Sequence, residues 1–90
     1  MADLSSWDAT SLKREIKRIV SGISRIDASE LEDHLKIRDE LGIDSLMAME
    51  ILGTCEKRLR LSLDEKLFAD VQTVGDFLDL MVAAWSRQIA

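Results

Sequence analysis

Ser45 is the side chain in this sequence that is best placed to do chemistry. It lies in residues 41–46, which read Leu-Gly-Ile-Asp-Ser-Leu, just before an apolar run with helical spacing. Gly42 lets the chain turn without steric cost, and either Asp44 or Ser45 can cap the free N–H groups at the start of the helix. The same N–H groups and the positive end of the helix dipole stabilise an anion. The segment therefore suits a phosphate esterified to Ser45, although an ordinary helix cap also explains these residues.

A catalytic role for Ser45 needs a base, and the sequence offers none close by. His34 lies eleven residues earlier in an irregular stretch, and the Gly-x-Ser-x-Gly pattern of a hydrolase is missing. Glycine-rich phosphate loops, a dinucleotide fingerprint and a calcium loop are missing as well. The single cysteine, Cys55, and His34 make a zinc site only if carboxylates supply most of the ligands. We therefore expect neither an enzyme nor a metal site, and a small esterase using Ser45 and His34 is the disfavoured alternative.

Length and composition predict one small globular domain. The 90 residues are 47% hydrophobic and 32% charged, a balance that disfavours disorder. No apolar run approaches the roughly 20 residues that span a bilayer, and the first residues lack a signal-peptide pattern, so we expect a cytoplasmic protein without a membrane partner. The net charge of −5 disfavours nucleic-acid binding and favours basic partner surfaces. Many of the residues before Ser45 are acidic, and they predict a negative electrostatic field around it. A monomer is the default expectation.

The first half of the chain reads as a helix followed by a long loop. Residues 1–8 are polar and aperiodic, and we interpret them as a loose N-terminal segment whose Trp7 can dock onto the fold. Apolar residues at helical spacing then predict an amphipathic helix over 9–21, which Gly22 ends or loosens. Residues 24–43 keep no period, but isolated apolar side chains punctuate them. This pattern predicts a long loop pinned to the core, and such loops are often functional.

Three further helices are predicted after this loop. The first covers 45–59, a short one of one to two turns covers 64–69, and Thr73 caps a last helix that ends near residue 87. Asp76, three residues after Thr73, completes a capping box. The inward stripe of the first of these helices consists of Ala48, Leu52, Cys55 and Leu59, with Cys55 read as a small buried hydrophobe. The expected fold class is all-α, a small four-helix bundle with a long loop between helices one and two and a short helix three.

Taken together, these residues resemble those of acyl carrier proteins and of the carrier domains of polyketide and fatty-acid synthases. The resemblance covers roughly residues 9–86 and rests on residues 41–46, on Glu50-Ile51, on 64–70 and on residues 73–78 at the start of the last helix. It implies an acyl carrier domain over 9–87 of the acyl-carrier bundle type. It also implies that Ser45 carries 4′-phosphopantetheine taken from coenzyme A, whose thiol holds acyl intermediates as thioesters.

The resemblance implies partners and contact residues too. A phosphopantetheinyl transferase would supply Mg²⁺ and the base, and ketosynthases, acyltransferases or acyl ligases with basic or apolar docking surfaces would exchange the cargo. The docking residues that it implies are Asp44, Leu46, Met47, Met49, Glu50 and Glu56. A growing acyl chain can tuck between helices two and three, where the implied lining is Ala48, Leu52, Leu61, Leu63, Leu67 and Phe68.

Departures from the fatty-acid-type pattern point to a pathway class. Those carriers usually open helix two with further acidic residues, whereas residues 46–50 of this chain, Leu-Met-Ala-Met-Glu, resemble polyketide carrier domains. Polyketide or other specialised acyl biosynthesis is therefore preferred over primary fatty-acid synthesis, with aminoacyl or peptidyl carriers third. The proline that often precedes helix three is absent near Leu63-Asp64, which leaves its start open by a residue or two. A small helical protein-interaction adaptor, with Ser45 only a cap, is the alternative from another class.

Overall fold

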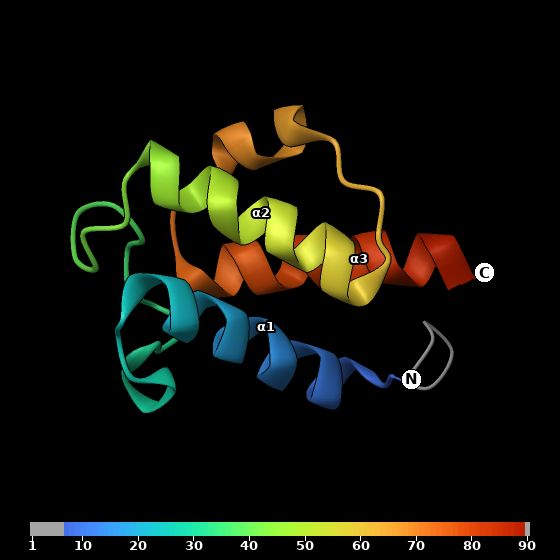
Figure 1. Ribbon diagram of the computed structural model, residues 1–90, viewed down its shortest axis with the longest axis horizontal. Coiled ribbons are helices and arrows are strands. Elements are labelled where there is room, and N and C mark those ends of the chain that lie inside the picture. The colour runs from blue at the N-terminus through green and yellow to red at the C-terminus, as the bar shows by residue number, and fades with distance from the viewer. Residues whose placement is uncertain (1–6, 90) are drawn as a thin grey trace.

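The computed structural model describes residues 7–89 and confirms the all-α prediction. Figure 1 shows the three α-helices packed along one another, with the 3₁₀ helix η3 on the opposite side of the bundle from α1. The loop before α2 lies at the end of the bundle that is far from both ends of the described chain. In chain order the elements are α1 (Ala9–Ser24), the 3₁₀ turn η2 (Ala28–Glu30), α2 (Ser45–Leu59), η3 (Glu65–Asp70) and α3 (Val74–Ile89).

A side-chain cap starts α1. The N–H of Ser11 donates to Asp8 Oδ1 at 2.7 Å, and the N–H of Asp8 donates to Ser11 Oγ at 3.1 Å. The hydrogen bond from the Ser11 N–H, the largest cause, favours the ionised carboxylate and lowers the pKa of Asp8. Trp7 is partly buried against the core, as expected for a docked tryptophan. Residues 1–6 of the predicted loose segment lie outside the described residues, and the domain boundary at residue 9 stays a prediction.

The end of α1 differs from the prediction at Gly22. The helix continues through this glycine to Ser24, and Arg25, with φ of 64°, closes it by donating its N–H to Ser21 O at 2.8 Å. Ile23, which follows the glycine, packs against the core. Its burial offsets the helix penalty of glycine, which is about 1 kcal/mol relative to alanine. Local propensity alone therefore placed the helix end too early.

The long loop between α1 and α2 is pinned as predicted, and the start of α3 holds it. Leu31 and Ile43 are fully part of the core, at 1% and 2% exposure. An isolated antiparallel bridge pairs Lys36 with Thr73. Three backbone hydrogen bonds join the two segments, from the N–H of Ile37 to Gln72 O (2.8 Å), of Val74 to Leu35 O (3.0 Å) and of Gly75 to Asp33 O (2.8 Å). The loop before Ser45 is therefore fixed by contacts that are remote in sequence.

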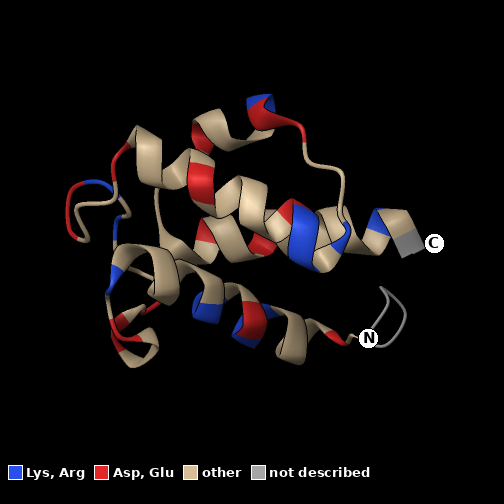
Figure 2. Ribbon diagram, viewed as in Figure 1, with Lys and Arg blue, Asp and Glu red and all other residues tan. Residues whose placement is uncertain are grey.

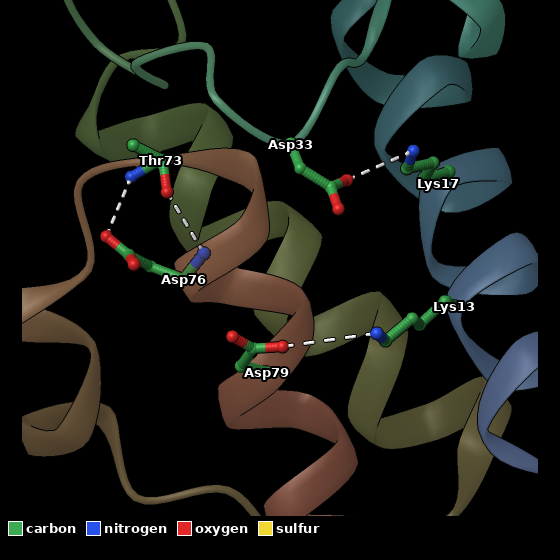
Figure 3. A network of polar contacts seen from close by, with 6 residues as sticks. All are labelled: Lys13, Lys17, Asp33, Thr73, Asp76 and Asp79. Carbon is green, nitrogen blue, oxygen red and sulfur yellow. Dashed lines mark hydrogen bonds and ion pairs between the residues drawn. The ribbon is translucent and has the colours of Figure 1, made fainter.

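Side chains at the same junction reinforce it (Figure 3). Thr73 and Asp76 form the predicted capping box, in which Asp76 N donates to Thr73 Oγ1 and Thr73 N donates to Asp76 Oδ2, each at 3.1 Å. The N–H groups of Thr73 and Gln72 both donate to the Asp76 carboxylate and lower its pKa. Lys17 Nζ lies 3.4 Å from Asp33 Oδ1 and connects α1 to the loop. Such an exposed ion pair adds little stability, so the backbone bonds and the cap do most of the anchoring.

Gly75 is predicted to be intolerant of a side chain, because a Cβ there would lie 3.1 Å from Asp33 O and 3.3 Å from Asp33 Cβ. The crowded oxygen is itself bonded to the Gly75 N–H and cannot move aside freely. We expect Gly75→Ala to lower the free energy of unfolding by about 1–2 kcal/mol in urea titrations. Gly53→Ala is the matched control, since open space surrounds Gly53 in mid-helix, and it should gain up to about 1 kcal/mol. Equal gains in both variants would contradict the tight contact.

The core lies between the three α-helices. Its four fully buried members at 0% exposure are Leu12, Ile16, Cys55 and Met81. The rings of Phe68 and Phe77, with centroids 5.7 Å apart, connect η3 to α3. In the part of the chain that the structure covers, no helix has the length and apolar character needed to cross a bilayer.

Candidate functional site

Asp44 is the residue that caps α2, which settles the choice between Asp44 and Ser45. Its Oδ1 accepts the N–H of Met47 at 2.9 Å, and its carbonyl accepts the N–H of Ala48 at 2.9 Å. The helix starts at Ser45 and ends at Leu59, as predicted. Gly42 has φ of 69°, a left-handed conformation that glycine adopts without strain. The turn and the cap together leave the Ser45 hydroxyl at the exposed start of the helix.

The Ser45 hydroxyl has a cationic partner. Arg38 Nη2 donates a hydrogen bond to Ser45 Oγ at 3.1 Å, and both side chains are exposed. A guanidinium cannot accept a proton, so Arg38 cannot serve as a base for Ser45. Sequence reasoning missed this residue, which lies seven positions before the serine. The sequence signal for Arg38 was weak. Lys36 and Arg38 are the lysine and the arginine in residues 27–50, a stretch in which the other charged residues are acidic.

Several of the acidic residues near Ser45 in sequence also have local structural roles, and the predicted negative field stays a prediction. Asp27 accepts the N–H of Ser29 at 3.1 Å, and Glu40 accepts the N–H of Lys36 at 3.0 Å. Figure 2 shows acidic and basic positions side by side on the loop before α2. The predicted negative field did not include the Arg38 cation, which contacts the hydroxyl directly. Neighbours in sequence are separated here by the turns of the loop.

Exposed apolar side chains occur on α2 close to Ser45 and on η3. Leu46 and Met49 on α2 are 82% and 53% exposed, and Leu67 on η3 is 44% exposed. Met47 is partly buried against the core. The remaining predicted docking residues are Asp44 and Glu50, which are exposed, and Glu56, which is partly buried and accepts the N–H of Leu63 at 3.2 Å. The docking role of this set stays a prediction.

A cavity of about 460 Å³ lies between α2, η3, the start of α3 and the loop. Three predicted lining residues, Ala48, Leu52 and Phe68, form part of its wall. The other three do not: Leu61 is buried in the core, Leu63 is partly buried and Leu67 is exposed. The wall is completed by residues that the sequence did not suggest, among them Ile37, Arg38, Ile43, Ile51, Val74 and Phe77. Its volume is within the range of roughly 300–1,000 Å³ typical of ligand pockets.

The arrangement fits a phosphodiester on Ser45. The hydroxyl is exposed, a guanidinium is already bonded to it, and the first N–H groups of α2 have no intrahelical partner. Among residues 7–89 the side chain that hydrogen-bonds to the hydroxyl is Arg38, which cannot act as a base, and His34 is an exposed residue of the loop. Within residues 7–89, no three His, Cys, Asp or Glu side chains group as metal ligands. The site can therefore present a serine for modification by another protein.

Comparison with known proteins agrees with this chemistry. The family described as "Phosphopantetheine attachment site" matches residues 14–81. The chain is 34% identical to non-reducing polyketide synthase dbaI of Emericella nidulans over 88% of its own length, and 39% identical to iterative polyketide synthase afoE of the same organism over 82%. It spans only 3% and 2% of those synthases. It is also 29% identical to an acyl carrier protein of Chlamydia caviae, over 76% of this chain and 88% of that protein. The chain belongs to the phosphopantetheine attachment-site family, as an acyl carrier whose cofactor is phosphopantetheine.

Proposed function

We propose that Ser45 is the attachment point of the 4′-phosphopantetheine arm and that the loaded chain carries acyl groups as thioesters in polyketide biosynthesis. The observation that carries this proposal is the exposed Ser45 hydroxyl at the start of α2, to which the Arg38 guanidinium donates a hydrogen bond. The polyketide synthases among its relatives support the choice of pathway. Primary fatty-acid synthesis is the second candidate, since a discrete acyl carrier protein, that of Chlamydia caviae, is also among the relatives.

In this function the chain is a substrate of other enzymes and catalyses nothing itself. Ser45 Oγ forms a bond to the β-phosphorus of coenzyme A, the pyrophosphate P–O bond breaks, and adenosine 3′,5′-bisphosphate leaves. The serine proton passes to a base of the phosphopantetheinyl transferase, which also supplies Mg²⁺. The bound arm supplies a thiol for thioester chemistry. The residues of this chain contribute an accessible hydroxyl, a rigid helix start and a docking surface.

We assign the docking surface to the exposed side of α2 next to Ser45. Leu46 and Met49 offer apolar contact area there, and methionine adapts its shape to different partners. Asp44 and Glu50 add negative charge that suits basic partner surfaces. Ketosynthases, acyltransferases and acyl ligases with basic or apolar docking surfaces are the proposed partners. Met47 and Glu56, which are partly buried, belong to the edge of this surface.

Loading with coenzyme A tests the proposed function. The purified chain is incubated with coenzyme A, Mg²⁺ and a broad-specificity phosphopantetheinyl transferase, and the intact mass is followed. We expect a gain of one phosphopantetheine and its localisation by peptide fragmentation to Ser45. No mass gain, under conditions in which an established carrier protein is fully loaded, would favour the interaction adaptor instead.

Cys55 gives this experiment an independent readout, because its thiol should not react with thiol reagents in the native chain. It is 0% exposed, and burial, followed by the charges of Glu15 and Glu56, raises its pKa to about 12. A thiol reagent such as dithiodipyridine should therefore label no thiol rapidly in the apo chain and one in the loaded chain. In denaturant the counts should rise to one and two. Cys55→Ala should leave the native counts unchanged, and rapid labelling of native apo chain would contradict the buried position of Cys55.

A further inference from the structure

Arg38 is the residue that connects Ser45 to the cavity. Its Nη2 lies 3.1 Å from Ser45 Oγ, and Arg38 is also one of the residues that line the cavity. Ala48, one helical turn after Ser45, lines the same cavity. The cavity therefore lies next to the attachment point, and Arg38 belongs to both.

The backbone that carries Arg38 is held in place by the fold. Ile37 donates its N–H to Gln72 O at 2.8 Å and accepts the N–H of Ile43 at 3.0 Å, and its side chain packs against the core. The carbonyl of Arg38 accepts the N–H of Gly42 at 3.1 Å. Arg38 therefore starts from a fixed position, so its side chain does not need a large loop movement to stay near Ser45.

The charges around this point favour a role toward an anion. A phosphate on Ser45 would lie next to the Asp44 carboxylate, which is committed to capping α2. Arg38 supplies a compensating positive charge at the hydroxyl itself. Lys36 and Lys17 also line the cavity, but Lys17 is paired with Asp33, and Asp39 is a carboxylate in the same lining. Arg38 is therefore the cation placed to attract a negatively charged group on Ser45.

We propose that Arg38 is a positioning residue that binds the phosphate of the loaded arm and directs the arm toward the cavity. This inference rests on the proposed function, since it requires a phosphodiester on Ser45. The phosphorus is one bond from Ser45 Oγ, so the guanidinium that now bonds to Oγ can bond to the non-bridging oxygens with little movement. Arginine suits this task better than lysine, because its planar fork binds two phosphate oxygens at once.

The test compares loaded wild type with loaded Arg38→Gln, Arg38→Lys and Arg14→Gln. Arg14 is an exposed arginine on α1 that is not part of the cavity wall, so its variant removes one charge elsewhere. The ³¹P resonance of the phosphodiester is measured at low and high salt for each chain. A hexanoyl thioester is then placed on the arm, and its rate of cleavage by hydroxylamine is measured per loaded chain. Circular dichroism of each variant establishes that the fold is intact.

We expect the ³¹P resonance of Arg38→Gln to move toward that of free phosphopantetheine and to lose its salt dependence. Cleavage of its thioester should be about 1.5- to 5-fold faster, the range expected for loss of one exposed ion pair. Arg38→Lys should recover part of both effects, and Arg14→Gln should match wild type. Identical resonances and cleavage rates in wild type and Arg38→Gln would overturn the role of Arg38. A wild-type chain that takes up no phosphopantetheine would overturn the proposed function and this inference with it.

Discussion

Replacing Ser45 with alanine should abolish loading with phosphopantetheine while leaving the fold intact. In the proposed reaction the hydroxyl oxygen of Ser45 forms the bond to phosphorus, and alanine has no atom that can replace it. The structural cost should be small, because Asp44 caps α2 and Ser45 is exposed. We expect the free energy of unfolding to change by no more than about 0.5 kcal/mol. Intact mass after incubation with coenzyme A and transferase measures the loading, and urea titration measures the stability.

Ser86→Ala is the matched control for this experiment. Ser86 is an exposed serine on α3, far along the chain from the start of α2. Its variant should load as completely as wild type. A chain with Ser45→Ala that still gains one phosphopantetheine would place the attachment point on another residue. Loss of helical signal in Ser45→Ala would instead mean that the serine supports the fold, contrary to the capping by Asp44.

The sequence predicted the helices well where side-chain spacing and caps agree. The bounds of α2 follow from one apolar stripe and an acidic cap, and the start of α3 follows from Thr73 and Asp76. Residues 64–69 predicted a short helix, and the structure has the 3₁₀ helix Glu65–Asp70 with Asp64 as its cap. The predicted end of α1 was wrong. Gly22 has a local preference against the helix, and the packing of Ile23 overrides that preference.

The site was harder to predict because its parts meet through tertiary contacts. Residues 41–46 indicated Ser45, but nothing in the spacing of the loop indicated that Arg38 folds back onto it. The lining of the cavity was equally hard to predict from the sequence. Helix periodicity places Ala48 and Leu52 on its wall, whereas Ile37 is brought to it by hydrogen bonds between the loop and the start of α3, and Leu61 is buried in the core instead. Long-range contacts of this kind have no local sequence pattern.

The largest loss of stability is expected from Met81→Ala in the centre of the core. Met81 is 0% exposed on α3. Truncation to alanine removes buried apolar atoms and leaves a void that the packed helices fill only in part, which costs about 2–5 kcal/mol. A domain of this size has roughly 5–13 kcal/mol of stability in total, so the variant should lose a large fraction of it. Urea unfolding followed by far-UV circular dichroism should show a lower midpoint with an unchanged slope.

Met49→Ala is the control that separates burial from residue type. It makes the same change of side chain on α2, at a position that is 53% exposed and next to Ser45. Its free energy of unfolding should stay within about 0.5 kcal/mol of wild type, because no void forms at an exposed site. The two methionine variants should also differ in their effects on function. Met49→Ala should load normally and weaken transfer of acyl groups to partner enzymes, whereas any defect of Met81→Ala should follow its unfolded fraction. Equal stability losses in the two variants would contradict the assignment of Met81 to the core and Met49 to the surface.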